Sequence, residues 1–370
     1  MKQNSVLIFG LGLIGGSICL KAKEKNLFDK IFAFGRNLEN LKLAKEQKII
    51  DGYYTNIDEI NFSEIDIIFL CTPIEMIIKI AEEIIPKINK KILITDVGST
   101  KSYITEKINE IIKSNKSKAE FIGAHPIAGK EKTGFKYSSA SLFENTYCII
   151  TPESDNSIEN IEKIKKLWQE LGSIVILMTP EKHDFITAII SHLPHIISAG
   201  LVNTANEEQK KEKELLNYAA GGFKDITRIS SSDEELWTQI CLSNKKEIIK
   251  ILDNFLKIIN NFKINLINEN KEKIKDYFLT AKNIRNSIRL KGVGLLQNFY
   301  DLLVDVVDKP GIIANITKLL SDNYINIKDI EILKYREEEN GVLKLSFANE
   351  DDLNNAFEIL NANNYLVKKR

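Results

Sequence analysis

Four histidines are the side chains of this sequence best suited to acid–base chemistry near neutral pH. All fall between residues 125 and 195, and they are His125, His183, His192 and His195. His125 lies in Gly-Ala-His-Pro-Ile-Ala-Gly (residues 123–129), directly after a predicted strand. Because ligands of open parallel sheets bind beyond the carboxyl ends of the strands, we expect His125 to reach such a ligand and to take a proton from it. A histidine that only caps a turn is the alternative.

The segment Ser-His-Leu-Pro-His (residues 191–195) places His192 and His195 at positions i and i+3 of a predicted helix that Pro194 kinks. We expect one ring to face a pocket and the other to pack among helices. Zinc bound by these rings and His183 is a competing interpretation. Neither a His-Glu-x-x-His spacing nor a nearby cysteine supports it, so no metal is predicted.

A glycine pair, Gly221-Gly222, opens onto a predicted helical turn that carries Arg228. A guanidinium there suits bidentate binding of a substrate carboxylate. A surface arginine paired with Asp225 is the alternative.

The start of the chain carries a Gly-x-Gly-x-x-Gly turn between the apolar run Val6–Phe9 and a predicted helix. Gly10 permits the tight turn, Gly12 lets the backbone approach a pyrophosphate, and Gly15 allows close packing of helix on strand. The helix then offers free N–H groups to the phosphates. The turn therefore predicts a dinucleotide site, although glycines of this spacing can also serve a tight turn alone.

The predicted second strand ends in Phe-Ala-Phe (residues 32–34) and is followed by Gly35-Arg36. An acidic residue there would bind the ribose 2′-OH of NAD, whereas Arg36 could face a 2′-phosphate, so the sequence favours NADP over NAD. Stacking of Arg36 on adenine or simple solvation are alternatives. Cys71-Thr72-Pro73 follows the apolar run Ile65–Leu70 and lies where a loop would cross the dinucleotide.

The elements that must hold these residues fall into three predicted domains. Residues 1–155 alternate continuous apolar runs with amphipathic segments, which predicts an α/β Rossmann-type domain with a mainly parallel sheet covered on both faces. Residues 156–292 read as mainly helical. Residues 298–370 follow the order strand-helix-strand-strand-helix, with a candidate last strand at Tyr365–Lys368, which is typical of a ferredoxin-like α+β module.

The composition excludes several classes of protein. The 370 residues hold 51 Lys+Arg and 51 Asp+Glu, and this zero net charge argues against a nucleic-acid or membrane-surface binder. The four cysteines form no Cys-x-x-Cys pair, which fits reduced thiols. Residues 3–20 are uncharged, but glycines interrupt them and no small-x-small cleavage site follows. We expect no other apolar run to be long enough to span a bilayer. We expect a soluble, cytoplasmic protein.

Together these segments resemble the prephenate/arogenate dehydrogenase family of tyrosine biosynthesis. The matching stretches cover roughly residues 5–290, and they are Gly10–Ser17, Asp96–Lys101, Gly123–Glu131, Ser191–His195 and Gly221–Arg228. The resemblance implies NAD(P)-dependent oxidative decarboxylation of prephenate to 4-hydroxyphenylpyruvate by a homodimer that pairs through its helical domains. Arogenate, which carries an amino group in place of the keto oxygen, is the alternative substrate, and a catalytically silent tyrosine-binding protein is a third hypothesis.

The resemblance also implies roles for individual residues. His125 would be the base, with Ser99 orienting the same hydroxyl. The implied substrate-binding residues are His195, Arg228, Glu131, Lys130, Asp225 and Trp237, of which Trp237 would reach a neighbouring subunit's site. The cofactor-binding residues are Gly10, Leu11, Gly12, Leu13, Ile14, Gly15, Arg36, Cys71, Thr72 and Pro73. Lys130 departs from the small or hydroxyl residue common at its place.

The segment Val304–Ile313 resembles an ACT domain, a small regulatory module that pairs through its sheet and binds amino acids. Its Asp-Lys-Pro-Gly turn opens a helix whose free N–H groups suit an amino-acid carboxylate. The resemblance implies feedback inhibition by tyrosine, with Asp308, Gly311 and Asn326 near the ligand. A module that serves only dimerisation is the alternative.

Overall fold

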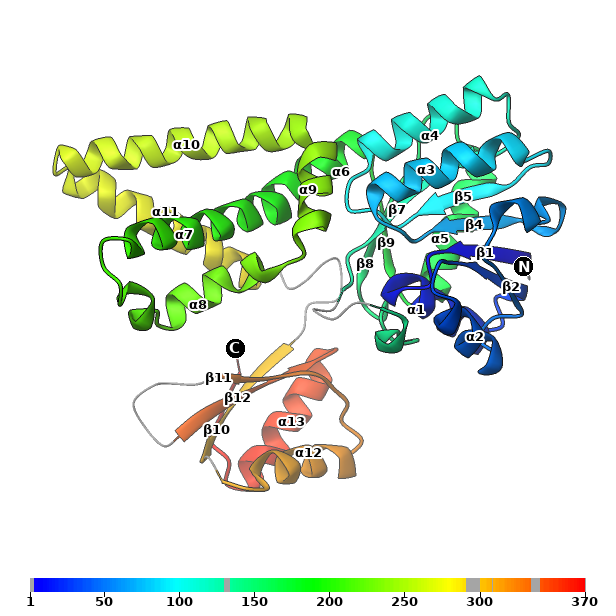
Figure 1. Cartoon of the computed structure of the whole chain (residues 1–370). Coiled ribbons are helices and arrows are strands. Elements are labelled where there is room, and N and C mark those ends of the chain that lie inside the picture. The colour runs from blue at the N-terminus through cyan, green and yellow to red at the C-terminus, as the bar shows by residue number, and fades with distance from the viewer. Residues whose placement is uncertain (1–2, 130–133, 291–299, 308, 334–339, 370) are drawn as a thin grey trace. The chain divides into compact units, whose positions relative to one another are not determined.

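The computed structural model of the chain describes residues 3–129, 134–290, 300–307, 309–333 and 340–369 (Figure 1). It forms two compact units, Met1–Ile259 and Asn260–Arg370. The predicted Lys130, Glu131 and Asp308 lie outside the described residues.

A six-stranded parallel sheet is the centre of the first unit, and its strand order is β3-β2-β1-β4-β5-β6. The strands are β1 (Gln3–Phe9), β2 (Phe28–Phe34), β3 (Gly52–Tyr54), β4 (Ile67–Leu70), β5 (Leu93–Asp96) and β6 (Glu120–Phe121). Every residue of β4 and β5 is buried, as expected for strands with both faces covered. The predicted Rossmann-type α/β domain is therefore confirmed.

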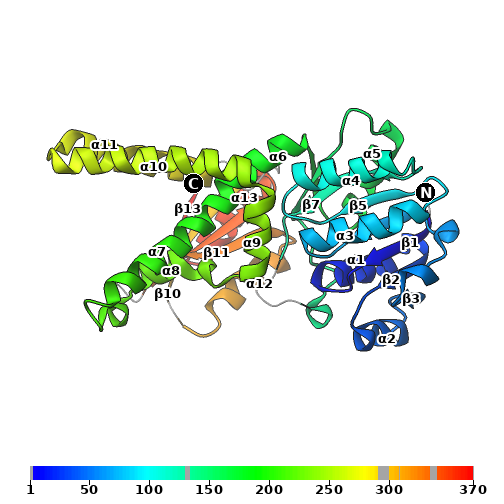
Figure 2. The same cartoon turned by 45° about the horizontal axis from the view of Figure 1, so that its top comes forward.

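Helices cover both faces of this sheet. They are α1 (Leu13–Glu24), α2 (Leu38–Glu46), α3 (Ile74–Ile84), α4 (Ser102–Ser114) and α5 (Ile158–Glu170). Apolar side chains of α1, α2 and α5 share one core with Val6 and Ile8, whereas those of α3 and α4 share a second core with Leu7 and Phe9. Alternate residues of β1 thus enter opposite cores, as the pleat of a strand requires. Figure 2 shows α3 and α4 side by side on one face.

A small second sheet carries the predicted base. It contains β7 (Gly123–Pro126), β8 (Tyr147–Thr151) and β9 (Ile174–Leu177), with β7 antiparallel and β9 parallel to β8. The chain passes into it from β6 through Ile122, whose N–H donates to the Ile94 carbonyl of β5 at 3.0 Å. His125 is therefore held by a strand that continues the edge of the main sheet.

The helical part of the first unit begins directly after β9. It contains α6 (Pro180–Thr187), a π-helical turn (Ala188–His192), α7 (Leu193–Gln209), α8 (Gly221–Thr227), a 3₁₀ turn (Arg228–Ser231), α9 (Glu234–Ser243) and α10 (Lys245–Ile267). The predicted distortion at Pro194 takes the form of this π turn just before it. Proline lacks the N–H that a regular turn needs and crowds the preceding turn, which the wider π geometry relieves.

The stretch Pro180–Gln209 is long and apolar enough, by length and composition alone, to cross a membrane, and 22% of its most apolar window is buried. The expectation that no run after residue 20 is long enough to span a bilayer therefore does not hold by this criterion. The stretch also carries His183 and Asp184, which are buried and hydrogen-bonded to the rest of the first unit. Ionisable groups paired in this way are typical of a helix that packs on protein.

The second unit begins within α10 and contains α11 (Lys271–Leu290) and a βαββαβ module. The module consists of β10 (Tyr300–Val307), α12 (Ile312–Asp322), β11 (Ile327–Leu333), β12 (Asn340–Phe347), α13 (Glu350–Ala362) and β13 (Val367–Lys369). Its antiparallel sheet has the order β11-β12-β10-β13, and one face packs on both helices. This confirms the predicted ferredoxin-like module, including its last strand.

Candidate active site

The glycine turn has the geometry that a dinucleotide needs. Gly10 has φ +93°, a conformation that side chains disfavour, and a Cβ there would lie 2.5 Å from the Cys71 carbonyl oxygen. A Cβ on Gly15 would collide with the carbonyl oxygen of Gly10. Gly12 differs, because a Cβ there would meet nothing within 4 Å. Gly10 and Gly15 therefore serve packing, and Gly12 leaves open space at the N-terminus of α1.

The start of α1 is free for an anion, because it has no side-chain cap and no acidic residue in its first turn. Leu13 and Ile14 lie in this first turn, and Leu11 directly precedes the N-cap residue Gly12. Thr72 follows β4 beside Gly10, and its hydroxyl oxygen is buried without a hydrogen-bond partner. Open space, a free helix N-terminus and an unpartnered hydroxyl are what a bound dinucleotide would fill and satisfy, so these residues fit the cofactor.

The end of β2 lies against the same turn, since the Gly10 N–H donates to the Phe34 carbonyl at 2.9 Å. Arg36, two residues further on, is exposed. Pro73 caps the start of α3 on the other side of the turn, next to the half-buried Cys71. The predicted cofactor residues are thus gathered at the carboxyl ends of β1, β2 and β4.

His125 is half-buried and forms one end of a hydrogen-bonded chain of side chains. Its Nδ1 lies 2.8 Å from Nε2 of His183, and Nδ1 of His183 lies 2.8 Å from Oδ1 of Asp184. The Asp184 carboxylate also accepts the N–H groups of Lys101 (2.7 Å) and Ser102 (2.8 Å). His183 and Asp184 are buried on α6, so this chain joins the helical part to the base on β7.

A buried ion pair fixes the backbone next to His125. Lys101 and Asp96 are fully buried and bonded to each other. The Lys101 ammonium also donates to the Ala124 carbonyl at 2.9 Å, and Asp96 accepts the Ala124 N–H at 3.1 Å. Both polar groups of the residue before His125 are therefore held by charges, which makes these hydrogen bonds strong.

Burial controls the protonation of this cluster. It lowers the pKa of His125 well below its usual value of 6.5, and the neighbouring His183 and Lys101 lower it further. It lowers the pKa of His183 too, although Asp184 opposes the shift, and it brings the pKa of His192 to about 4. Burial alone would raise the pKa of Asp184, but the bond to His183 holds it below normal. At neutral pH the three rings are uncharged beside an ionised carboxylate.

The predicted substrate residues lie on neighbouring helices. His195 on α7 is half-buried and stacks on Trp237 of α9, with ring centroids 3.8 Å apart. His192 is buried, whereas His195 is half-buried; that one of the two rings faces a substrate pocket remains a prediction. Arg228 is exposed at the end of α8, in a turn that packs on α7, and Asp225 is exposed on α8. Trp237 therefore contacts His195 of its own chain; its predicted reach into a neighbouring subunit remains a prediction.

Ser99 lies in the loop after β5 and is half-buried. The next residue, Thr100, shares a 2.9 Å hydrogen bond with Ser243 of α9. β5 contacts β7, so the loop of Ser99 follows a neighbour of the strand that carries His125.

From the sequence, His183 is not predicted as a partner of His125. No role is predicted for Asp184, Asp96, Lys101 or Asn244 either, although Asp96–Lys101 is one of the stretches that match the family. A local signal exists in the adjacent His-Asp pair that follows Thr179-Pro180 at a predicted helix start. The sequence alone does not show that this pair faces inward.

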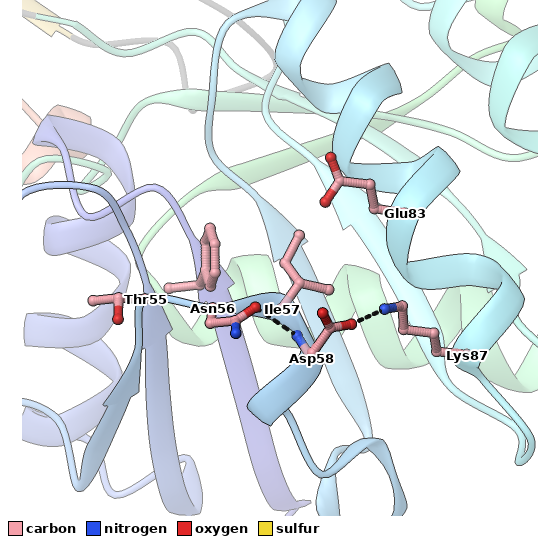
Figure 3. Close-up of a pocket in the computed structure, with 7 residues that line it drawn as sticks. Thr55, Asn56, Ile57, Asp58, Glu83 and Lys87 are labelled. Carbon is pink, nitrogen blue, oxygen red and sulfur yellow. Dashed lines mark hydrogen bonds and ion pairs between the residues drawn. The ribbon is translucent and has the colours of Figure 1, made fainter.

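The described surface also contains pockets away from this cluster. One of about 380 Å³ lies beside the ends of β2 and β3 and is crossed by the Asp58–Lys87 ion pair (Figure 3). Another, of about 960 Å³, lies at the amino ends of β4 and β5. Neither contains a predicted site residue, so neither changes the assignment of the site.

Comparisons with known proteins show which families the parts of this chain resemble. The family model described as "Prephenate dehydrogenase, nucleotide-binding domain" matches residues 18–177, and "Prephenate dehydrogenase, dimerization domain" matches 179–280. An "AHAS small subunit-like ACT domain" matches residues 302–365. A protein of Bacillus subtilis (strain 168) named prephenate dehydrogenase is 35% identical over 361 residues, which cover 97% of this chain and 96% of that protein.

Two solved structures extend the comparison. Prephenate dehydrogenase from A. aeolicus, in complex with hydroxyphenyl propionate and NAD+, has a TM-score of 0.70 and 31% identity, covering 78% of this chain and 99% of that one. Synechocystis arogenate dehydrogenase has a TM-score of 0.68 and 27% identity, covering 76% and 99%.

Alanine at two glycines should separate cofactor binding from folding. Gly12→Ala places a methyl group in open space, so thermal unfolding without cofactor should match the wild type, whereas the dinucleotide Kd should rise by about tenfold or more. The added methyl group in Gly15→Ala collides with backbone, so the free energy of unfolding should fall by on the order of 1–3 kcal/mol. The melting temperature should fall by several degrees. Calorimetric titration and thermal scans test both. Equal cofactor affinity in Gly12→Ala and wild type would contradict the assignment.

Acid should destabilise the protein through its buried histidines. Unfolded histidines bind protons below about pH 6.5, whereas His125, His183 and His192 resist them in the folded chain. Between these pKa values the unfolded state holds more protons, so the free energy of unfolding should fall as the pH drops from 6.5 towards 4. Urea unfolding at pH 7 and pH 5 measures this, and His192→Gln should reduce the pH dependence. An unchanged slope in that variant would contradict the shift at His192.

Proposed function

The chain belongs to the prephenate dehydrogenase family, and on this basis we propose that it converts prephenate to 4-hydroxyphenylpyruvate by NAD(P)-dependent oxidative decarboxylation. The observation that carries the proposal is the neutral His125, which is held at the end of a strand by a buried network and lies in the same unit as a glycine turn that fits a dinucleotide. Oxidation of a hydroxyl-bearing carbon needs both parts.

The protein's part in the reaction is orientation and removal of one proton. Bound NAD(P) would take up the hydride that leaves the hydroxyl-bearing ring carbon. His125 would accept the hydroxyl proton at Nε2, because its Nδ1 is occupied by His183. Ser99 would orient the same hydroxyl. Loss of the ring carboxylate as CO₂ makes the ring aromatic, and this supplies the driving force.

We propose that the carboxylate groups of the substrate are bound from the helical side. Arg228 would hold one carboxylate, and His195, backed by the ring of Trp237, would line the pocket. Glu131, with Asp225, would belong to a charged gate at the pocket mouth, and Lys130 would alter recognition of the substrate side chain. Arogenate is the second candidate substrate, supported by the similarity to an arogenate dehydrogenase of known structure.

The cofactor preference is proposed to be NADP. Arg36 follows the strand end that is bonded to the glycine turn, where a 2′-phosphate would lie. Rates with NAD and NADP, each measured with prephenate and with arogenate, test the substrate and the cofactor assignments together.

We further propose a cytoplasmic homodimer with three functional domains. The large exposed apolar side chains of α7 and α10, among them Leu201, Ile249 and Leu256, would be covered in the dimer. Because β9 pairs with β8 and Trp168 of α5 packs in the first core, the first domain extends past the predicted residue 155 to about Leu177. The helical domain would then run to residue 292 and the ACT domain from 298 to 370.

Substitution of the base should stop turnover without unfolding the protein. His125→Asn keeps a polar side chain but removes the proton acceptor, so kcat should fall by roughly 10²- to 10⁴-fold. Formation of reduced cofactor from prephenate measures this, and an unchanged circular dichroism spectrum controls for folding. Wild-type turnover in the variant would mean that another group takes the proton.

Tyrosine inhibition is proposed to act through the ACT module. Gly311, with φ +88°, starts α12 with no side-chain cap and no acidic residue in the first turn, and Asn326 is exposed just before β11. A chain ending after Leu290 should keep turnover and lose inhibition, because the module has its own core. Steady-state rates with and without tyrosine test this. Undiminished inhibition would place tyrosine in the active site instead.

A further inference from the structure

The buried histidines carry information on where their protons sit, because several of their partners can only accept or only donate. The Asp184 carboxylate is ionised and only accepts. Nδ1 of His183, 2.8 Å from it, must therefore be the donor. Since His183 is neutral, its Nε2 has no proton and can only accept. The 2.8 Å bond to His125 then requires a proton on His125 Nδ1, which leaves Nε2 of the neutral His125 as a bare acceptor.

Asn244, which bonds the backbone carbonyl of Asp184, determines the proton position of His192. Asn244, at the end of α9, is 3% exposed, and its amide Nδ2 donates to the Asp184 carbonyl at 2.9 Å. The same NH₂ group lies 3.2 Å from Nδ1 of His192. An amide nitrogen does not accept hydrogen bonds, so Nδ1 of His192 is the acceptor and its proton is on Nε2.

His125 and His192 thus have opposite proton positions, and both are determined through residue 184. The Asp184 carboxylate fixes the proton position of His125 through the ring of His183. The Asp184 carbonyl accepts a hydrogen bond from the Asn244 amide, which in turn faces Nδ1 of His192. The N–H groups of Lys101 and Ser102 orient the carboxylate, so the network is anchored at the N-terminal end of α4. Because each ring is neutral and its partners are buried, the alternative tautomer would leave a buried group unsatisfied.

We propose that His183, Asp184 and Asn244 are positioning residues that fix these two tautomers: they keep Nε2 of His125 free to accept a proton and keep the proton of His192 on Nε2. This inference rests on the proposed function only for its catalytic consequence. His183 and Asp184 would also stabilise the proton taken up by His125 during turnover, as a carboxylate does behind a catalytic imidazole.

The direct test is ¹⁵N NMR of the full-length protein with labelled histidine, which distinguishes protonated from bare ring nitrogens. The sequence contains only four histidines, so single substitutions assign the signals. At neutral pH and without ligands, His125 should show a protonated Nδ1 and a bare Nε2, and His192 the reverse. A protonated Nε2 on His125 in the wild type overturns the inference and needs no variant to fold.

Three variants test how the tautomer is fixed. His183→Leu removes the acceptor, so His125 should show both tautomers and kcat should fall by roughly 10- to 100-fold with a smaller change in KM. His183→Gln retains an acceptor and a donor and should restore the single tautomer and most of kcat. Asn244→Leu, in the same buried network but without contact to His125, should alter only the His192 signals.

The outcomes separate this inference from the proposed function. Equal loss of the His125 pattern in His183→Leu and Asn244→Leu would indicate general disruption and would overturn the positioning role. The predicted tautomers in a wild-type protein that does not turn over prephenate would support the inference and contradict the proposed function.

Discussion

The Asp184 carboxylate is the group on which the arrangement of the site depends. A buried carboxylate is costly unless each oxygen is hydrogen-bonded, and here backbone N–H groups of Lys101 and Ser102 and the His183 ring satisfy it. Because Asp184 lies on α6 and its donors lie at the start of α4, the same bonds join the helical part to the sheet. A single set of contacts thus positions both sides of the proposed pocket.

The Asp96–Lys101 pair applies a similar constraint to the strand that carries the base. Both side chains are fully buried, so removal of either partner would leave an uncompensated charge and would cost about 3–5 kcal/mol. The pair bonds both backbone groups of Ala124, which limits the movement of His125. Burial also keeps the ring neutral, so the rigidity and the basic form of His125 have the same origin.

Local patterns in the sequence predicted the elements and part of the site. The apolar runs predicted the parallel sheet, and the glycine spacing predicted the turn before α1. The position of His125 directly after a predicted strand indicated that it lies at the sheet edge. The contacts of His183 could not be predicted, because its partner is 58 residues away. The burial of Lys101 could not be predicted either, because lysine side chains are usually exposed to solvent. The packing of α5 in the first core could not be predicted either, because contacts with distant strands, rather than local composition, bring Trp168 there.

We propose above all that His125 receives the substrate proton while Arg228 holds a carboxylate of the same substrate. A crystal structure of the full chain with oxidised cofactor and 4-hydroxyphenylpyruvate tests this proposal most directly. We expect the phenol oxygen within about 2.6–3.2 Å of His125 Nε2 and the product carboxylate on Arg228. A phenol oxygen bound by another side chain, with His125 turned away from the ring, would contradict it.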